Sequence, residues 1–125
     1  MQHLTRKMVD DTLCLMDGEE QIFSMQETQE NGGQAVSVVV AGSLRTDSEH
    51  DFGDELMALA GFGLDIQLSL EGVTHISSGA MRALLDVQKR LDALGQGSLT
   101  IKKVPEAVLK DLESTGITEL LMIEE

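Results

Sequence analysis

The sequence predicts an α/β fold in which strands and helices alternate, and three observations carry this prediction. The 125-residue chain is 42% hydrophobic, which is enough for one domain with a buried core. Alternating or Val-rich runs typical of strands occur at residues 22–27, 35–40, 64–70 and 98–101. Helical spacing of apolar residues separates the later runs. Because strand–helix–strand units require right-handed crossovers, the sheet should be mainly parallel beyond its first hairpin.

The first two strands are predicted to form a hairpin. Asn31 and Gly32 lie between them, and this pair tolerates the positive φ that a tight hairpin turn demands. A Gly-rich phosphate-binding loop is the alternative, but it lacks a nearby lysine and a helix directly after it. The helix after the hairpin should begin with a capping box of Thr46 and Glu49 and end at residues 61–63.

The first 20 residues are the hardest part to assign. Apolar residues in this segment fit one side of a helix, whereas residues 12–16 fit a short strand equally well. We therefore treat residues 1–20 as an N-terminal accessory segment and residues 21–125 as the folded domain. At the other end, a helix beginning near Pro105 and a short strand or apolar segment at residues 120–123 complete the chain.

Two adjacent serines stand where a strand gives way to a helix. Residues 71–73 are expected to turn out of the strand, and apolar residues at helical spacing follow Ser78. A helix N-terminus offers unpaired N–H groups and positive dipole character. Ser77 or Ser78 can therefore cap the helix, which contributes about 1 kcal/mol. A phosphate on the serine would be held by the same N–H groups, with Arg82 one turn further on.

Composition argues against several classes of partner. The net charge of −13 and an aromatic content of 2% oppose binding to nucleic acid.

No apolar run approaches the ~20 residues of a membrane span, and no signal-peptide pattern follows the basic start, so we expect a cytoplasmic protein that is not membrane-embedded. The single Cys14 cannot form an internal disulfide. Residues 79–104 nevertheless hold five cationic against two acidic side chains, which would suit an acidic partner or a phosphate.

We expect no enzyme activity. A nucleophilic serine needs an activating base, and His75 precedes the junction without an evident carboxylate to orient it. The sequence has no G-x-S-x-G motif. His50 is expected at the surface, and no cluster of metal ligands accompanies it, so no metal and no cofactor are predicted.

The order of elements and the serine junction resemble the STAS family, which includes the anti-sigma factor antagonists. Residues 36–44, 64–73, 73–85 and 112–121 carry the resemblance. It implies a four- or five-stranded mixed sheet with helices packed mainly on one face. It also implies regulation, because in antagonists a GHKL-type serine kinase, the anti-sigma factor, phosphorylates a serine or threonine at the start of the central helix. The unphosphorylated antagonist binds that kinase and releases a sigma factor for transcription.

The matching phosphorylation site is Ser78, with Ser77 as second choice. The resemblance also assigns partner binding to Ser77, Ser78, Gly79 and Arg82. Ser77 stands where relatives often carry Asp, and Gly79 and Ala80 reverse a common Ala-Gly order. The alternative is a STAS subunit that docks on a membrane transporter or a stressosome-like scaffold without phosphorylation, with Ser78 only a helix cap. A homodimer formed near Met122 is possible, and a titration with GTP should show no binding because the chain has no P-loop.

Overall fold

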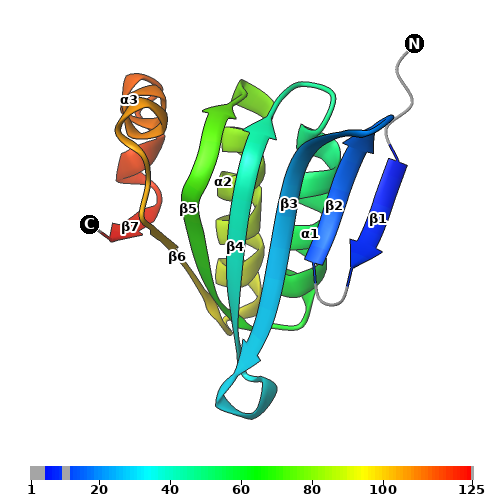
Figure 1. The fold of residues 1–125 in the computed structure, drawn as a ribbon. Helices are drawn as coiled ribbons and strands as arrows, with labels where there is room; N and C mark the ends of the chain where they lie inside the picture. The colour runs from blue at the N-terminus through cyan, green and yellow to red at the C-terminus, as the bar shows by residue number, and fades with distance from the viewer. Residues whose placement is uncertain (1–4, 10–11, 125) are drawn as a thin grey trace.

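The computed structural model describes residues 5–9 and 12–124, and a single seven-stranded mixed sheet forms its centre (Figure 1). The strands lie side by side in chain order: β1 (Thr5–Val9), β2 (Thr12–Asp17), β3 (Glu20–Glu30), β4 (Ala35–Leu44), β5 (Asp65–Ile76), β6 (Ser98–Lys102) and β7 (Met122–Glu124). Neighbours from β1 to β4 pair antiparallel, and those from β4 to β7 pair parallel. The α/β class and mixed sheet are confirmed, whereas the prediction of four or five strands is wrong.

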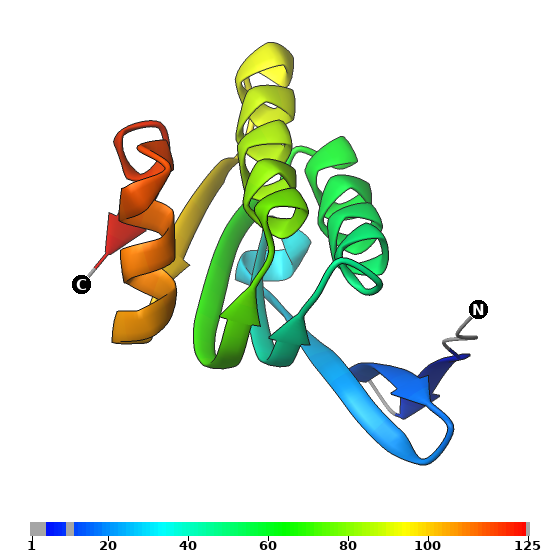
Figure 2. The ribbon, with the colours of Figure 1, turned by 90° about the horizontal axis from the view of Figure 1, so that it is seen from above.

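Three α-helices connect the parallel strands in the described part of the chain. They are α1 (Glu49–Gly61), α2 (Ser78–Leu94) and α3 (Glu106–Ser114), and 3-10 turns η1 (Asn31–Gly33) and η2 (Ile117–Glu119) complete the elements. Helices α1 and α2 lie side by side on one face of the sheet, while α3 lies beside β6 and β7 (Figure 2). No helix among the described residues is long and apolar enough to cross a membrane.

The extra strands come mainly from the N-terminal segment. Strand β2 pairs with β3 and contributes Leu13 and Leu15, each 1% exposed, to the core. Strand β1 is exposed along its length, and Arg6 on it forms ion pairs with Asp51 and Glu55 of α1. The boundary between an accessory segment of residues 1–20 and a domain of residues 21–125 stays a proposal.

The β3–β4 hairpin forms as predicted. Its connection is the turn η1, in which Asn31 and Gly32 both adopt positive φ, at 52° and 65°. Nearby on β3, the carboxyl group of Glu27 is partly buried and faces Glu55 of α1. Burial, followed by the charge and hydrogen bond of Glu55, raises the pKa of Glu27 above its ordinary value of 4.5.

Strand β5 does not turn at residues 71–73, which corrects the expectation from the sequence. It runs on to Ile76 through two register shifts opposite β4. Gly72 makes this possible because a Cβ atom there would lie 2.7 Å from Cβ of Ala41. The extension matters for the site, since the N–H of Ser77 donates to the carbonyl of Leu44 at 2.7 Å and so ties the serine junction to the end of β4.

Candidate functional site

Ser77, not Ser78, caps the central helix α2. Its backbone is extended, and its Oγ accepts a hydrogen bond from the N–H of Ala80 at 3.1 Å. The same hydroxyl donates to Oε2 of Glu49 at 2.5 Å. The residue as a whole is 9% exposed. The hydroxyl of Ser77 is therefore buried and committed at both its donor and acceptor sides.

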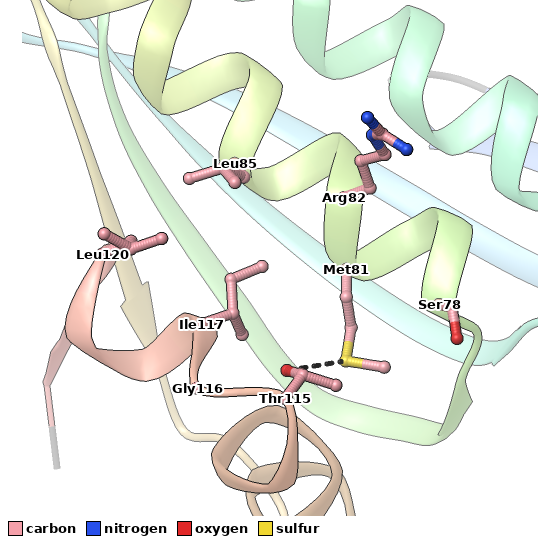
Figure 3. Close-up of a pocket in the computed structure, with 8 residues that line it drawn as sticks. All are labelled: Ser78, Met81, Arg82, Leu85, Thr115, Gly116, Ile117 and Leu120. Atoms are coloured by element: carbon pink, nitrogen blue, oxygen red, sulfur yellow. Dashed lines mark hydrogen bonds between the residues drawn. The ribbon is translucent and has the colours of Figure 1, made fainter.

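Ser78 is the first residue of α2 and is exposed. Its hydroxyl has no hydrogen-bond partner among the described residues, and it lies at the rim of a pocket (Figure 3). The junction thus separates the two serines by role. Ser77 holds the helix end together, and Ser78 presents a free hydroxyl at the same helix N-terminus.

Glu49 reaches this junction from the first turn of α1. The predicted capping box of Thr46 and Glu49 is wrong, because α1 begins after Ser48 and has no side-chain cap hydrogen bond. The buried Ser48 instead closes its own turn, accepting from the N–H of Arg45 at 2.9 Å. Glu49 is free to turn towards α2, where its carboxylate lies against Gly79 so closely that a Cβ atom at Gly79 would overlap it.

An apolar pocket of about 230 Å³ opens beside Ser78. One wall comes from α2 and the other from the turn after α3 together with η2, as Figure 3 shows. Its lining residues are Ser78, Met81, Arg82, Leu85, Thr115, Gly116, Ile117 and Leu120. Thr115 and Met81 touch across the pocket, with Oγ1 and Sδ 3.9 Å apart.

Arg82 lies between this pocket and a second, more polar hollow of about 280 Å³ between α1 and α2. Glu49, His50, Asp54 and Asp86 also line that hollow. The guanidinium of Arg82 points towards α1, away from Ser78 (Figure 3). The structure therefore places Ser77, Ser78, Gly79 and Arg82 in one region without a contact between the side chains of Ser78 and Arg82.

Sequence reasoning missed two parts of this site. Glu49 was assigned to its own helix, and the pocket wall at Ile117 and Leu120 lies more than 30 residues from the serines. The helical spacing that includes Leu85 was the available signal in the sequence, whereas the exposure of Leu120, at 59%, is visible only in the structure. No group of three or more potential metal ligands occurs among residues 5–9 and 12–124.

Comparison with known proteins decides the family. A family model described as "Mlab, STAS domain" matches residues 27–124. The chain belongs to the STAS family. No curated protein matches the sequence. The match begins within β3, so β1 and β2 lie outside the matched region of this STAS domain.

Solved structures share the fold at low sequence identity. A putative anti-sigma factor antagonist from Thermotoga maritima is 18% identical with a TM-score of 0.66, over 81% of this chain and 86% of that one. The phosphorylated form of SpoIIAA, a Bacillus cell fate determinant, is 14% identical with a TM-score of 0.60, over 81% and 91%. The murine anion transporter Slc26a9 is 18% identical with a TM-score of 0.59, over 69% of this chain and 14% of the transporter. These likenesses establish the fold.

Proposed function

We propose that this STAS domain is a regulatory protein–protein interaction module of the anti-sigma factor antagonist type, and that phosphorylation of Ser78 switches its binding. The observation that carries the proposal is the division between the two serines. Ser77 is buried and hydrogen-bonded on both sides, whereas Ser78 is exposed with a free hydroxyl. A kinase can reach only the second without first opening the helix end.

The start of α2 can carry a phosphate without losing the fold. A phosphate adds a charge of about −1.5 to −2, and the dipole and free N–H groups of a helix N-terminus favour such a charge. Arg82 is one turn away and forms no ion pair with the described residues, so it can turn towards the phosphate. Glu49 opposes the added charge from α1. A partner packed on the pocket would meet the new charge directly.

The partner in this proposal is a GHKL-type serine kinase that acts as an anti-sigma factor, and the setting is the cytoplasm. Ser77, Ser78, Gly79 and Arg82 form the contact region. The chain acts by binding and is not itself an enzyme. Support comes from the anti-sigma factor antagonists among the structural neighbours and from SpoIIAA, whose structure is known in a phosphorylated form.

A second candidate has its own observation in favour. The fold is also found within the murine anion transporter Slc26a9, and the family model carries the description "Mlab, STAS domain". In this candidate the chain docks on a membrane transporter, or on a stressosome-like scaffold, without phosphorylation. The exposed side of α2 remains the contact surface, and Ser78 contacts the partner as an unmodified hydroxyl.

The test combines phosphosite mass spectrometry with affinity capture of the tagged chain from its native cells. We expect phosphate on Ser78 and none on Ser77, with a GHKL-type kinase bound to the unphosphorylated chain. Ser78→Asp should abolish capture while leaving the unfolding midpoint near that of the wild type. Thr28→Asp, an exposed substitution on β3, is the matched control and should capture the kinase normally. If Ser78→Asp captures the kinase like the wild type, the switch is refuted. A transporter or scaffold bound to a chain with unmodified serines supports the second candidate instead.

A further inference from the structure

Cationic side chains without an ion-pair partner gather on α2. Arg82, Lys89 and Arg90 are all exposed, and none of them lies within ion-pair distance of an acidic group in the described residues. Five other Lys and Arg residues do form ion pairs, at positions 6, 45, 102, 103 and 110. In a chain with a net charge of −13, this concentration of unpaired positive charge on one helix is a distinct feature of the surface.

The unpaired cations line up with the apolar pocket. Ser78, Arg82, Leu85 and Lys89 are spaced by four, three and four residues, so they form one stripe along α2. Asp86 and Asp92 of α2 lie beside this stripe, and Glu49 and Asp54 of α1 line the hollow next to Arg82, but none of these carboxylates forms an ion pair with Arg82 or Lys89. The far wall of the pocket is apolar and open, because Leu120 of the turn after η2 is 59% exposed.

The pocket is too small for a typical organic ligand. Its volume is about 230 Å³, whereas pockets for drug-sized molecules span about 300–1,000 Å³. One large apolar side chain is a better match. Such an anchor in a pocket, with charged groups at the rim, is the usual arrangement of a protein–protein contact.

We propose that this pocket binds an acidic segment of a protein partner, with one apolar side chain inserted between Leu85 and Leu120 and carboxylates placed against Arg82 and Lys89. The inference rests on the proposed function, in which a protein partner binds around Ser78, and it adds the chemistry of that partner. The inference also explains how a phosphate on Ser78 would weaken binding of the partner. A phosphate on Ser78 competes with the partner's carboxylates for Arg82 at the mouth of the pocket.

Three synthetic helical peptides test the proposal directly. The first has one central leucine with glutamates one turn before and after it, the second has lysines in place of the glutamates, and the third has alanine in place of the leucine. Methyl NMR of the full chain should show the first peptide shifting the signals of Met81, Leu85 and Leu120. Its affinity should exceed that of each of the other two by at least about tenfold, and it should weaken with added salt.

Charge reversal sharpens the test. The double variant Arg82→Glu with Lys89→Glu should reverse the preference and bind the lysine peptide more tightly. The matched control, Lys7→Glu with Lys110→Glu, places the same change on β1 and α3 and should keep the preference of the wild type. Leu120→Ser removes an exposed side chain and should weaken the first peptide by about tenfold.

Several outcomes would overturn the proposal. These are equal affinities for the acidic and basic peptides, absence of binding, or shifts confined to other exposed apolar residues such as Phe62 and Leu94. Binding of anionic vesicles in preference to the first peptide, or self-association of the chain that Leu120→Ser abolishes, would assign the surface to a membrane or to a second copy. The phosphorylation switch at Ser78 is tested independently of the peptide experiments. If the peptides behave as expected but Ser78→Asp still captures the kinase, the phosphorylation switch fails and the docking chemistry stands.

Discussion

Replacement of Gly79 by alanine tests the contact that joins the two helices at the serine junction. Gly79 is the second residue of α2, and the carboxylate of Glu49 lies directly over it. A methyl group at residue 79 would overlap that carboxylate. Because this carboxylate is at the end of a flexible side chain, it can move aside. The carboxylate then loses the hydrogen bond that the hydroxyl of Ser77 donates to it.

Two opposing effects determine how much Gly79→Ala changes the free energy of unfolding. A hydrogen bond to a charged group contributes about 1.5–3 kcal/mol, and the lower end applies here because Glu49 is partly exposed and regains water. Replacement of glycine by alanine within a helix returns up to about 1 kcal/mol. We therefore expect Gly79→Ala to destabilise the wild type by about 0.5 kcal/mol. In a Glu49→Ala background the three atoms nearest to the methyl group are gone, and the same change should stabilise by up to about 1 kcal/mol.

Urea denaturation of the four proteins in this double-mutant cycle measures the effect. The expected coupling energy is about 1.5 kcal/mol, well above the ~0.5 kcal/mol within which independent substitutions add. Gly61→Ala is the matched control, because Gly61 is the last residue of α1 and a Cβ atom there meets nothing within 4 Å. Gly61→Ala should change the free energy of unfolding by the same amount with Glu49 and with Glu49→Ala. Equal effects of Gly79→Ala with and without Glu49 would refute the contact.

Three further predictions concern stability. Since the pKa of Glu27 is raised above 4.5, ionisation of this carboxyl lowers stability as the pH rises through and above that value. Glu27→Gln should therefore raise the free energy of unfolding at pH 7, measured with urea, by at most about 0.5 kcal/mol, because the side chain is only partly buried; the gain should vanish below pH 4.5, and a gain independent of pH would contradict this. Gly42 has φ of 103°, and a Cβ atom there would lie 2.7 Å from Cα of Phe23, so Gly42→Ala should cost more than about 2 kcal/mol in the same assay. Ser77→Ala should cost about 2.5 kcal/mol, about 1 through loss of the cap and about 1.5 through loss of the hydrogen bond to Glu49, whereas Ser78→Ala should change stability by less than about 0.5 kcal/mol; equal costs would mean that the two serines are not divided by role.

Much of the fold followed from periodicity. Residues 64–70 alternate, and the inward-facing Ile66, Leu68 and Leu70 of β5 are all fully buried. The hairpin followed from Asn31 and Gly32, whose backbone conformations depend on local sterics alone. These features were readable because each depends on residues close together in the chain.

The N-terminal strands could not be predicted, because the contacts that define them are not local in the sequence. In β2, Leu13, Cys14 and Leu15 are all buried, so the apolar run has no period that separates a strand from a helix. Strand β1 has no buried face and is defined by its pairing with β2. The bulge at Gly72 was mistaken for a turn because the close approach of Ala41 belongs to another strand. In each case the deciding contact is not local.

The serine junction shows why the site was only partly predictable. A helix boundary read from sequence is uncertain by a residue or two, and a shift of one residue exchanges the roles of Ser77 and Ser78. The structure separates them through Glu49, which precedes Ser77 by 28 residues and fixes its hydroxyl. The carboxylate of Glu49 also lies directly over Gly79, the residue after Ser78. The residue that holds the cap hydroxyl therefore also puts a negative charge next to the proposed phosphorylation site, so the stability of the junction and the proposed switch both involve Glu49.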